Sequence, residues 1–68
     1  MYLSECLSGQ EKIIVGFSDG AGSRMSALGF FVGAKIQVVK TNRYMMVVVV
    51  SNTFYAVDKT FAGRVVVR

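Results

Sequence analysis

The 68-residue sequence contains no histidine, no proline and no tryptophan, and it has one cysteine, Cys6. Without histidine the chain lacks the commonest general base and the commonest ligand for soft metal ions. A lone cysteine cannot form a disulfide within the chain. The carboxylates also lie far apart in the sequence, at Glu5, Glu11, Asp19 and Asp58. We therefore expect a protein that is not an enzyme, has no cofactor and builds no tight metal site alone.

Long hydrophobic runs are missing as well. The longest, residues 27–34 and 45–50, fall far short of the roughly 20 residues that a membrane-spanning helix needs. The first residues, Met-Tyr-Leu-Ser-Glu-Cys, lack the basic start and the apolar centre of a secretion signal. The sequence therefore predicts a cytoplasmic protein without a membrane span.

Apolar residues, in contrast, are abundant. They make up 53% of the chain, and the mean hydropathy is +0.49. This composition excludes intrinsic disorder and predicts a single domain, residues 1–68. A domain of this size buries only about 60% of the surface that its unfolded chain exposes. We expect the surplus of apolar side chains to contact a protein partner or a second copy of the chain.

The charge balance is basic, with eight Lys and Arg against four Asp and Glu and a net charge of +4. No two of the basic residues are adjacent, whereas phosphate binding depends on clustered positive charge. A solvated basic surface is therefore favoured, and we expect no nucleic-acid partner. The alternative, a nucleic-acid-binding barrel, would use exposed rings to stack bases, with Tyr44, Phe54 and Tyr55 as candidates.

Short β-forming segments recur along the chain. They predict strands at residues 12–17, 35–41, 45–50, 54–57 and 65–67. Residues 24–28 are predicted to form a short helix, with Met25 and Leu28 on its inner face. Ser23 is its predicted N-cap, and Gly29 is predicted to end it in the left-handed backbone conformation. A loop is predicted at 18–23, a tight turn at 51–53 and a helical turn at 58–63. Gly16 suggests a bend or bulge. The fold class is therefore all-β, a small β-barrel of about five strands with one short α-helix.

The segment from residue 24 to residue 33 resembles the FeoA family, which carries the pattern Arg-Leu-x-x-Leu-Gly-Phe/Leu-x-x-Gly. The matching residues are Arg24, Leu28, Gly29, Phe30 and Gly33, and the similarity covers essentially the whole chain. The resemblance implies an SH3-like small barrel and a cytoplasmic accessory role in bacterial ferrous iron uptake. The implied partner is the cytosolic GTP-binding part of the membrane ferrous iron transporter, FeoB.

A link to iron as Fe²⁺ is implied by this resemblance alone. A related barrel forms the C-terminal domain of iron-dependent repressors, so a weak transition-metal-binding module is a second alternative. Weak metal capture by carboxylates across an oligomer contact also stays open. Cys6, where the family usually has Leu, is expected to be a small buried hydrophobe.

Four apolar residues occupy positions that are commonly polar in the family: Phe31, Val47, Val49 and Val66. If Met46, Val48 and Val50 point inward, Val47 and Val49 must point outward. Either other parts of the chain cover these side chains, or they form a docking surface for a protein partner, possible self-association included. In the second case Arg24, Lys40 and Arg43 could supply a polar rim that steers an acidic partner.

Overall fold

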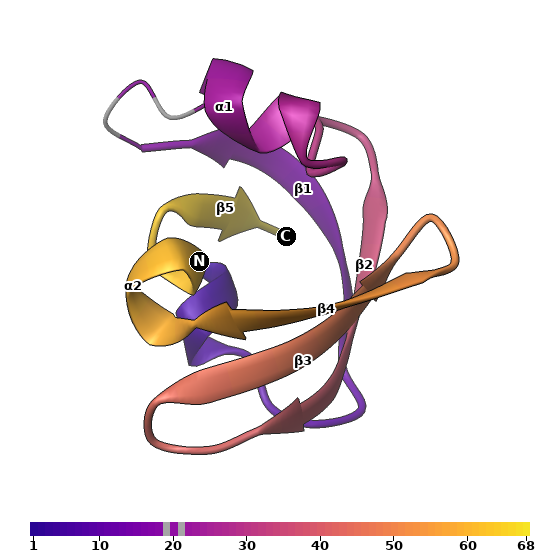
Figure 1. Ribbon diagram of the computed structural model, residues 1–68, viewed down its shortest axis with the longest axis vertical. Coiled ribbons are helices and arrows are strands. Elements are labelled where there is room, and N and C mark those ends of the chain that lie inside the picture. Colours follow the sequence, from indigo (N-terminus) through magenta and orange to yellow (C-terminus); the bar gives the residue numbers. More distant parts are fainter. Residues whose placement is uncertain (19, 21) are drawn as a thin grey trace.

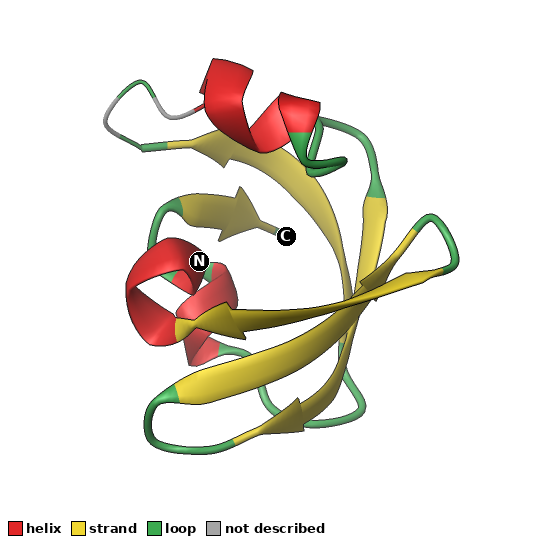
Figure 2. Ribbon diagram, in the orientation of Figure 1, coloured by secondary structure: helices red, strands yellow, loops and turns green. Residues whose placement is uncertain are grey.

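The computed structural model describes residues 1–18, 20 and 22–68, and it describes residue 23 by its backbone alone. Figure 1 shows a curled antiparallel sheet with short helices packed against it, and Figure 2 shows the same elements by type. The strands are β1 (Glu11–Phe17), β2 (Lys35–Thr41), β3 (Met45–Val50), β4 (Thr53–Asp58) and β5 (Val65–Val67), and their order in the sheet is β4-β3-β2-β1-β5. The helical elements are η1 (Leu3–Glu5), α1 (Gly22–Ala27) and α2 (Lys59–Ala62).

The predicted fold class is confirmed, since five short antiparallel strands form the sheet. The predicted helical turn at 58–63 is a helix, α2, so the chain has two short α-helices instead of one. The backbone N–H of Phe61, in the first turn of α2, donates to the Asp58 carboxylate, which caps the helix.

Two irregularities bend the sheet. The register between β1 and β5 shifts between Ile14 and Gly16, and the register between β2 and β3 shifts between Val38 and Lys40. Such bulges increase the local twist and let a strand curl. The bend predicted at Gly16 is confirmed, and Figure 1 shows β1 arcing across the molecule.

Strand alternation builds the core. Ile36 and Val38 of β2 have no exposed surface, and Met46, Val48 and Val50 of β3 are at most 1% exposed. Because neighbouring residues of a strand face opposite sides, Val47 and Val49 point to the outer face of the sheet. The inward and outward assignments made for β3 are therefore confirmed.

The segment after α1 contains one confirmed and one wrong prediction. The N–H of Phe30 donates to the Met25 carbonyl at 2.9 Å, and Gly29 has a φ of +99°, so the helix ends with glycine in the expected left-handed conformation. The chain leaves the helix after Ala27, which puts Phe30 into the core beside Met25. Leu28, predicted on the inner face with Met25, is 51% exposed for this reason.

The start of α1 also differs from the prediction. The helix begins at Gly22, so Ser23 lies inside its first turn and is not the N-cap. A Cβ at position 22 would approach the Phe17 ring to 3.3 Å, and glycine avoids this contact at the first helical position. The predicted loop at 18–23 is therefore shorter, and its residues 19 and 21 lie outside the described part of the chain.

The tight turn between β3 and β4 is confirmed at Ser51 and Asn52, with φ of 51° and 63°. Two successive residues with positive φ are typical of a type I′ hairpin, which fixes the register of the strands that it joins. In the described part of the chain, no helix has the length and the apolar character to span a membrane.

Candidate protein-docking site

Val47 and Val49 lie on the outer face of β3, where strand neighbours flank both side chains. Val47 stands opposite Lys40 of β2 and Ala56 of β4, and Val49 stands opposite Phe54 of β4. Both valines are half-buried, whereas Phe54 is 68% exposed. The structure thus brings Val47, Val49 and Lys40 of the predicted docking surface together.

The outer face is not uniformly apolar beside Val49. A hollow of about 280 Å³ opens there, and its other lining residues are polar or charged: Glu11, Lys35, Gln37, Ser51 and Asn52. The Lys35 ammonium lies 4.0 Å from a Glu11 carboxylate oxygen, and both side chains are well exposed. An apolar partner group at Val49 would therefore have to desolvate charged neighbours.

The other predicted docking residues lie elsewhere. Val66 is half-buried in β5 opposite Gly16, and β1 and β2 separate its strand from β3 in the sheet. Phe31 is 46% exposed in the segment between α1 and β2. Two strands therefore separate Val66 from Val47 and Val49, and Phe31 lies outside the strands.

The predicted basic rim is exposed but also distributed. Arg24 lies in α1, Lys40 in β2 and Arg43 in the turn between β2 and β3. The Arg43 guanidinium carbon lies 5.9 Å from the ring centroid of Tyr44, a cation–π distance. Whether these residues contact a partner stays a prediction.

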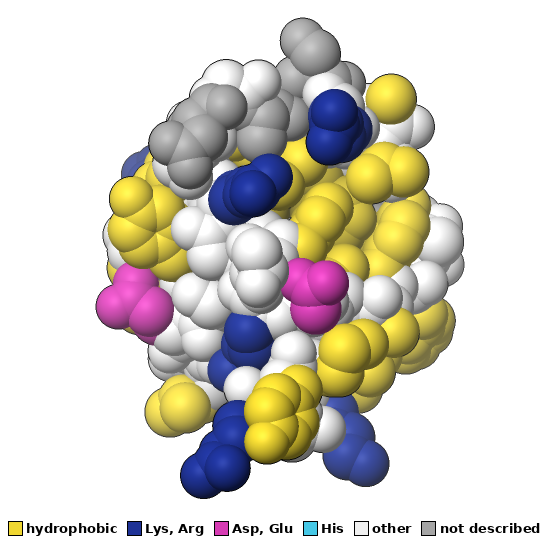
Figure 3. Space-filling view, turned by 60° about the vertical axis from the view of Figure 1, so that its left-hand side comes forward, with side chains coloured by type: hydrophobic (Ala, Val, Ile, Leu, Met, Phe, Trp, Pro, Cys, Tyr) yellow, Lys and Arg dark blue, Asp and Glu magenta, His cyan; other side chains and the backbone are white. Residues whose placement is uncertain are grey.

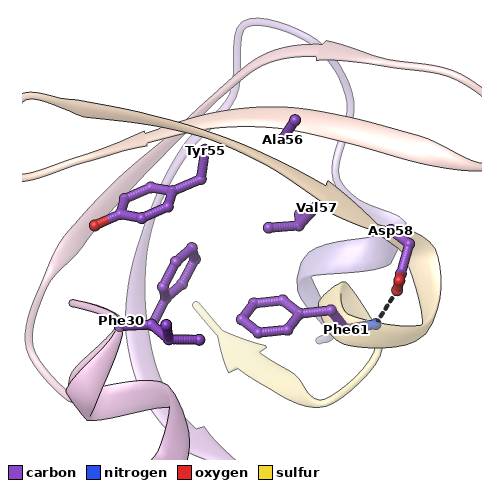
Figure 4. A pocket seen from close by; sticks show the side chains of 7 residues that line it. Phe30, Tyr55, Ala56, Val57, Asp58 and Phe61 are labelled. Atoms are coloured by element: carbon purple, nitrogen blue, oxygen red, sulfur yellow. Dashed lines mark hydrogen bonds between the residues drawn. The ribbon is translucent and has the colours of Figure 1, made fainter.

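A second apolar site, which we call the aromatic groove, lies between β4, α2 and the end of α1. It has a volume of about 290 Å³ and is lined by Leu28, Phe30, Tyr55, Ala56, Val57, Asp58 and Phe61. In Figure 4 the side chains of Phe30, Tyr55, Val57 and Phe61 point toward one another, while Ala56 points away from the hollow. Six of the seven lining residues are apolar or aromatic, so the groove suits an apolar side chain.

Ring contacts hold the groove in shape. The Phe30 ring packs edge-on against Tyr55, with 4.9 Å between centroids, and against Phe61, with 5.2 Å between centroids. Gly29 supports this arrangement, because a Cβ there would stand 2.8 Å from the Tyr55 hydroxyl. The Asp58 carboxylate fixes Phe61 by accepting its backbone N–H at 2.7 Å.

The sequence did not reveal this groove. Phe30 belongs to the recognised motif, but Leu28, Tyr55, Val57 and Phe61 were not predicted to share a site with it. The available signal was the alternation of Tyr55 and Val57 on one face of a strand. The contact of Tyr55 with the Phe30 ring, 25 residues earlier in the sequence, depends on how the sheet curls.

Charged groups surround the groove unevenly. Figure 3 shows hydrophobic side chains gathered on one flank of the face that carries α2, with an acidic side chain directly beside them and Lys and Arg side chains above and below. Asp58 is the acidic residue among those lining the groove. The groove itself suits an apolar group, and the net charge of +4 favours a partner whose negative charge lies away from Asp58.

Groups for metal or covalent chemistry are sparse in the described structure. In residues 1–18, 20 and 22–68, no three Cys, Asp or Glu side chains gather in a group that could hold a metal ion. Cys6 is 2% exposed, and burial raises the pKa of its thiol above the ordinary value of 9.0. The thiolate, which would be the metal ligand or nucleophile, is thereby disfavoured.

Comparison with known proteins adds to this geometry. A family model described as the FeoA domain matches residues 1–68. A crystal structure of an iron uptake regulatory protein (FeoA) is 33% identical, with a TM-score of 0.90, over 100% of this chain and 93% of the other. No curated protein matched the chain.

Two further solved structures share the architecture. Zinc-complexed FeoA from Stenotrophomonas maltophilia is 26% identical, with a TM-score of 0.85, over 100% of this chain and 89% of that one. It is described as a prokaryotic SH3 domain protein and a candidate activating factor of ferrous iron transport. A FeoA-like protein from Clostridium acetobutylicum, 12% identical with a TM-score of 0.88 over 100% of this chain and 84% of that one, shares the fold. The expected SH3-like architecture is thus confirmed.

Proposed function

This chain belongs to the FeoA family and so has a role in ferrous iron transport, and from that premise we propose that it is a non-enzymatic, cytoplasmic accessory protein. Its task is to dock on the cytosolic GTP-binding part of the membrane ferrous iron transporter, FeoB. The observation that carries this proposal is the surplus of exposed apolar side chains on a very small domain. Among the described residues these include Leu7, Leu28, Val32, Tyr44 and Phe54, each at least 51% exposed.

Binding to the transporter's GTP-binding domain, measured by titration calorimetry, tests the proposal. The wild-type chain is expected to bind, with a positively charged surface that meets an acidic partner. The variant Val47→Glu/Val49→Glu examines the predicted β3 surface, since two carboxylates would oppose both apolar contact and an acidic partner. Unchanged binding by this variant, with a native circular dichroism spectrum, would remove β3 from the docking surface. No binding by the wild type would refute the docking function.

We also propose that Fe²⁺ is the cargo of the transport system and not a tightly held ligand of this chain. The buried Cys6 thiol and the scattered carboxylates support this, because a tight site needs several converging donors. Titration of the monomer with Fe²⁺ under anaerobic conditions, and with Zn²⁺, should show only weak uptake. Stoichiometric, tight binding of either ion would contradict the proposal.

Nucleic-acid binding is less well supported by the geometry. Tyr44 and Phe54 are each 68% exposed and could stack on bases. Tyr55, the third candidate ring, is half-buried and packs against Phe30. The remaining two rings belong to a turn and to β4, without a cluster of basic residues between them in the sequence.

A further inference from the structure

Strand β4 has a free edge. It pairs with β3 along its whole length and stands at the end of the sheet order. In the part of the chain that the structure describes, no other strand pairs with β4. An edge strand presents backbone N–H and C=O groups that can pair with another chain.

The register identifies which backbone groups point outward. The N–H of Lys59 donates to the Tyr44 carbonyl at 2.9 Å, so this pair, directly beyond the pair Met45–Asp58, is a hydrogen-bonded one. Hydrogen-bonded and non-hydrogen-bonded pairs alternate along an antiparallel ladder. Phe54 and Ala56 consequently form non-hydrogen-bonded pairs with β3 and direct their N–H and C=O groups to the free edge.

The opposite end of β4 gives the same assignment. Ser51 and Asn52 make a two-residue turn, and the residues that flank such a turn, Val50 and Thr53, form a hydrogen-bonded pair. Counting from Thr53, the next outward-directed residues are again Phe54 and Ala56. Among residues 1–18, 20 and 22–68, no backbone bond outside the helices and strands engages either residue.

This free edge borders the aromatic groove. Ala56 lines the groove although its side chain points away from the hollow (Figure 4). The part of Ala56 that faces the groove is therefore its main chain. Natural edge strands are commonly protected by proline, lysine or a bulge. The sequence of β4, Thr-Phe-Tyr-Ala-Val-Asp, has neither proline nor lysine, and its register with β3 is regular.

We propose that β4 accepts an extended acidic segment of the protein partner as an additional strand, with one of its apolar side chains in the aromatic groove. The proposal rests on the docking function and specifies its surface and mode. Main-chain pairing would supply affinity, and the pocket would select alternate side chains of the added strand. The side chains of such a strand that face the same side as Tyr55 and Val57 enter the groove.

Charge favours an acidic partner over a second copy of this chain. The net charge of +4 makes two copies repel one another. Arg24 lies one helical turn before Leu28 at one side of the groove, and Arg43 precedes Tyr44, whose carbonyl bonds to Lys59 beside Asp58. Both arginines are exposed, and their segments adjoin residues that line the groove, Leu28 for Arg24 and Asp58 for the segment of Arg43.

A synthetic probe tests the mode of binding without the transporter. The probe is the capped heptapeptide Glu-Val-Glu-Leu-Glu-Val-Glu, and its control carries Lys in place of each Glu. Titrated into the ¹⁵N-labelled full chain, the acidic probe should shift the amide signals of Phe54 and Ala56 and bind at least tenfold more tightly than the control. Absence of binding by the acidic probe, or shifts confined to other strands, would overturn the proposal.

Ala56→Pro removes the outward N–H while leaving the β3 ladder intact, because edge strands tolerate proline where the N–H faces solvent. It should weaken probe binding at least tenfold, whereas the matched control Ala56→Ser, which keeps the N–H, should bind like the wild type. Leu28→Glu, at an exposed position of the groove, should weaken binding similarly and replaces Ala56→Pro if that variant does not fold. Unchanged binding by folded Ala56→Pro or by Leu28→Glu would overturn the proposal.

The transporter's GTP-binding domain supplies the second arm. If it binds the wild type but not Ala56→Pro or Leu28→Glu, the docking function and the β4 assignment both stand. Equal binding to all three chains would overturn the β4 assignment and leave the docking function intact. No binding to the wild type would refute the docking function, while the peptide result would still decide the mode. A dimer that Ala56→Pro abolishes, seen by analytical ultracentrifugation, would assign the edge to a second copy and overturn the proposal.

Discussion

The aromatic groove and the outer face of β3 are both built from apolar side chains, but they differ in what surrounds those side chains. On β3, Val47 and Val49 are half-buried by neighbours in the adjoining strands, and the hollow beside Val49 carries a Lys35–Glu11 pair. In the groove, three aromatic rings from separate segments line a hollow beside β4, the strand at the end of the sheet order. In the described sheet, the groove therefore borders a strand that is paired on one side, whereas Val47 and Val49 of β3 have strand neighbours on both sides.

The difference shows that an outward-facing valine is not by itself a binding surface. A β-branched side chain in the middle of a sheet gains contacts from residues directly opposite on both sides. Val47 has two such neighbours, Lys40 and Ala56, and the apolar part of a lysine side chain can cover a valine. In the described sheet, a residue of the edge strand β4 has such a neighbour on one side, in β3.

The largest expected effect is on the free energy of unfolding, and it distinguishes Phe30 in the aromatic groove from Phe54 on the outer face of the sheet. Phe30→Ala, at a side chain 1% exposed, should lower the free energy of unfolding by about 3–5 kcal/mol because it leaves a cavity under Tyr55 and Phe61. Phe54→Ala, at a side chain 68% exposed, should change it by less than about 0.5 kcal/mol. Urea denaturation followed by circular dichroism measures both values.

Folded domains have a free energy of unfolding of about 5–15 kcal/mol. If that of this small domain lies near the low end, the Phe30→Ala variant is partly unfolded at room temperature. Phe30→Leu is then the variant to compare, since it keeps an apolar side chain and should cost less. Equal losses for Phe30→Ala and Phe54→Ala would show that the groove is no better packed than the outer face and would end the distinction between the two regions.

The next largest effect concerns the support of the groove. Gly29→Ala has to place a side chain at a φ of +99° and 2.8 Å from the Tyr55 hydroxyl. Gly33→Ala has a comparable φ of +93° but meets nothing within 4 Å. The left-handed conformation costs about 1–2 kcal/mol in both, so Gly29→Ala should be the less stable variant by the energy of its contact with Tyr55.

Thermal denaturation measures this difference, because about 1 kcal/mol shifts the midpoint of a domain of this size by about 4–8 °C. Tyr55→Phe removes the clashing oxygen and should restore part of the loss in Gly29→Ala but none in Gly33→Ala. Identical midpoints for the two glycine variants would show that Tyr55 moves freely and that Gly29 does not define the groove.

The strands and the end of α1 could be predicted from the sequence because the signals are local. In β2 and β3, which are rich in β-branched residues, buried and more exposed side chains alternate along the strand. Gly29 adopts the left-handed conformation, which costs other residues free energy. The start of α1 was predicted wrongly because Ser23 is a good N-cap by type, whereas the Phe17 ring beside position 22 belongs to a different element.

The candidate site was harder to predict for a physical reason. Phe30, Tyr55 and Phe61 meet only because the sheet curls and α2 turns back over it, and neither feature is encoded in a short stretch of sequence. The outward direction of Val47 could be predicted from alternation, but its position between Lys40 and Ala56 depends on the register of three strands. Exposure of Leu28 likewise depends on where α1 ends.

The smallest expected effect concerns Asp58, which lines the groove and also stands opposite Met45 of β3. Its carboxylate accepts the N–H of Phe61 at 2.7 Å, so Asp58→Ala should cost about 1 kcal/mol of stability through loss of the helix cap. Asp58→Asn keeps an acceptor and should cost only a few tenths of that. Both variants remove the negative charge that lines the groove, so both should bind the acidic heptapeptide more tightly than the wild type. If Asp58→Ala bound it more weakly while Asp58→Asn bound it more tightly, the position of Phe61 would matter more than charge, and the groove would be defined by its rings and not by its electrostatic surroundings.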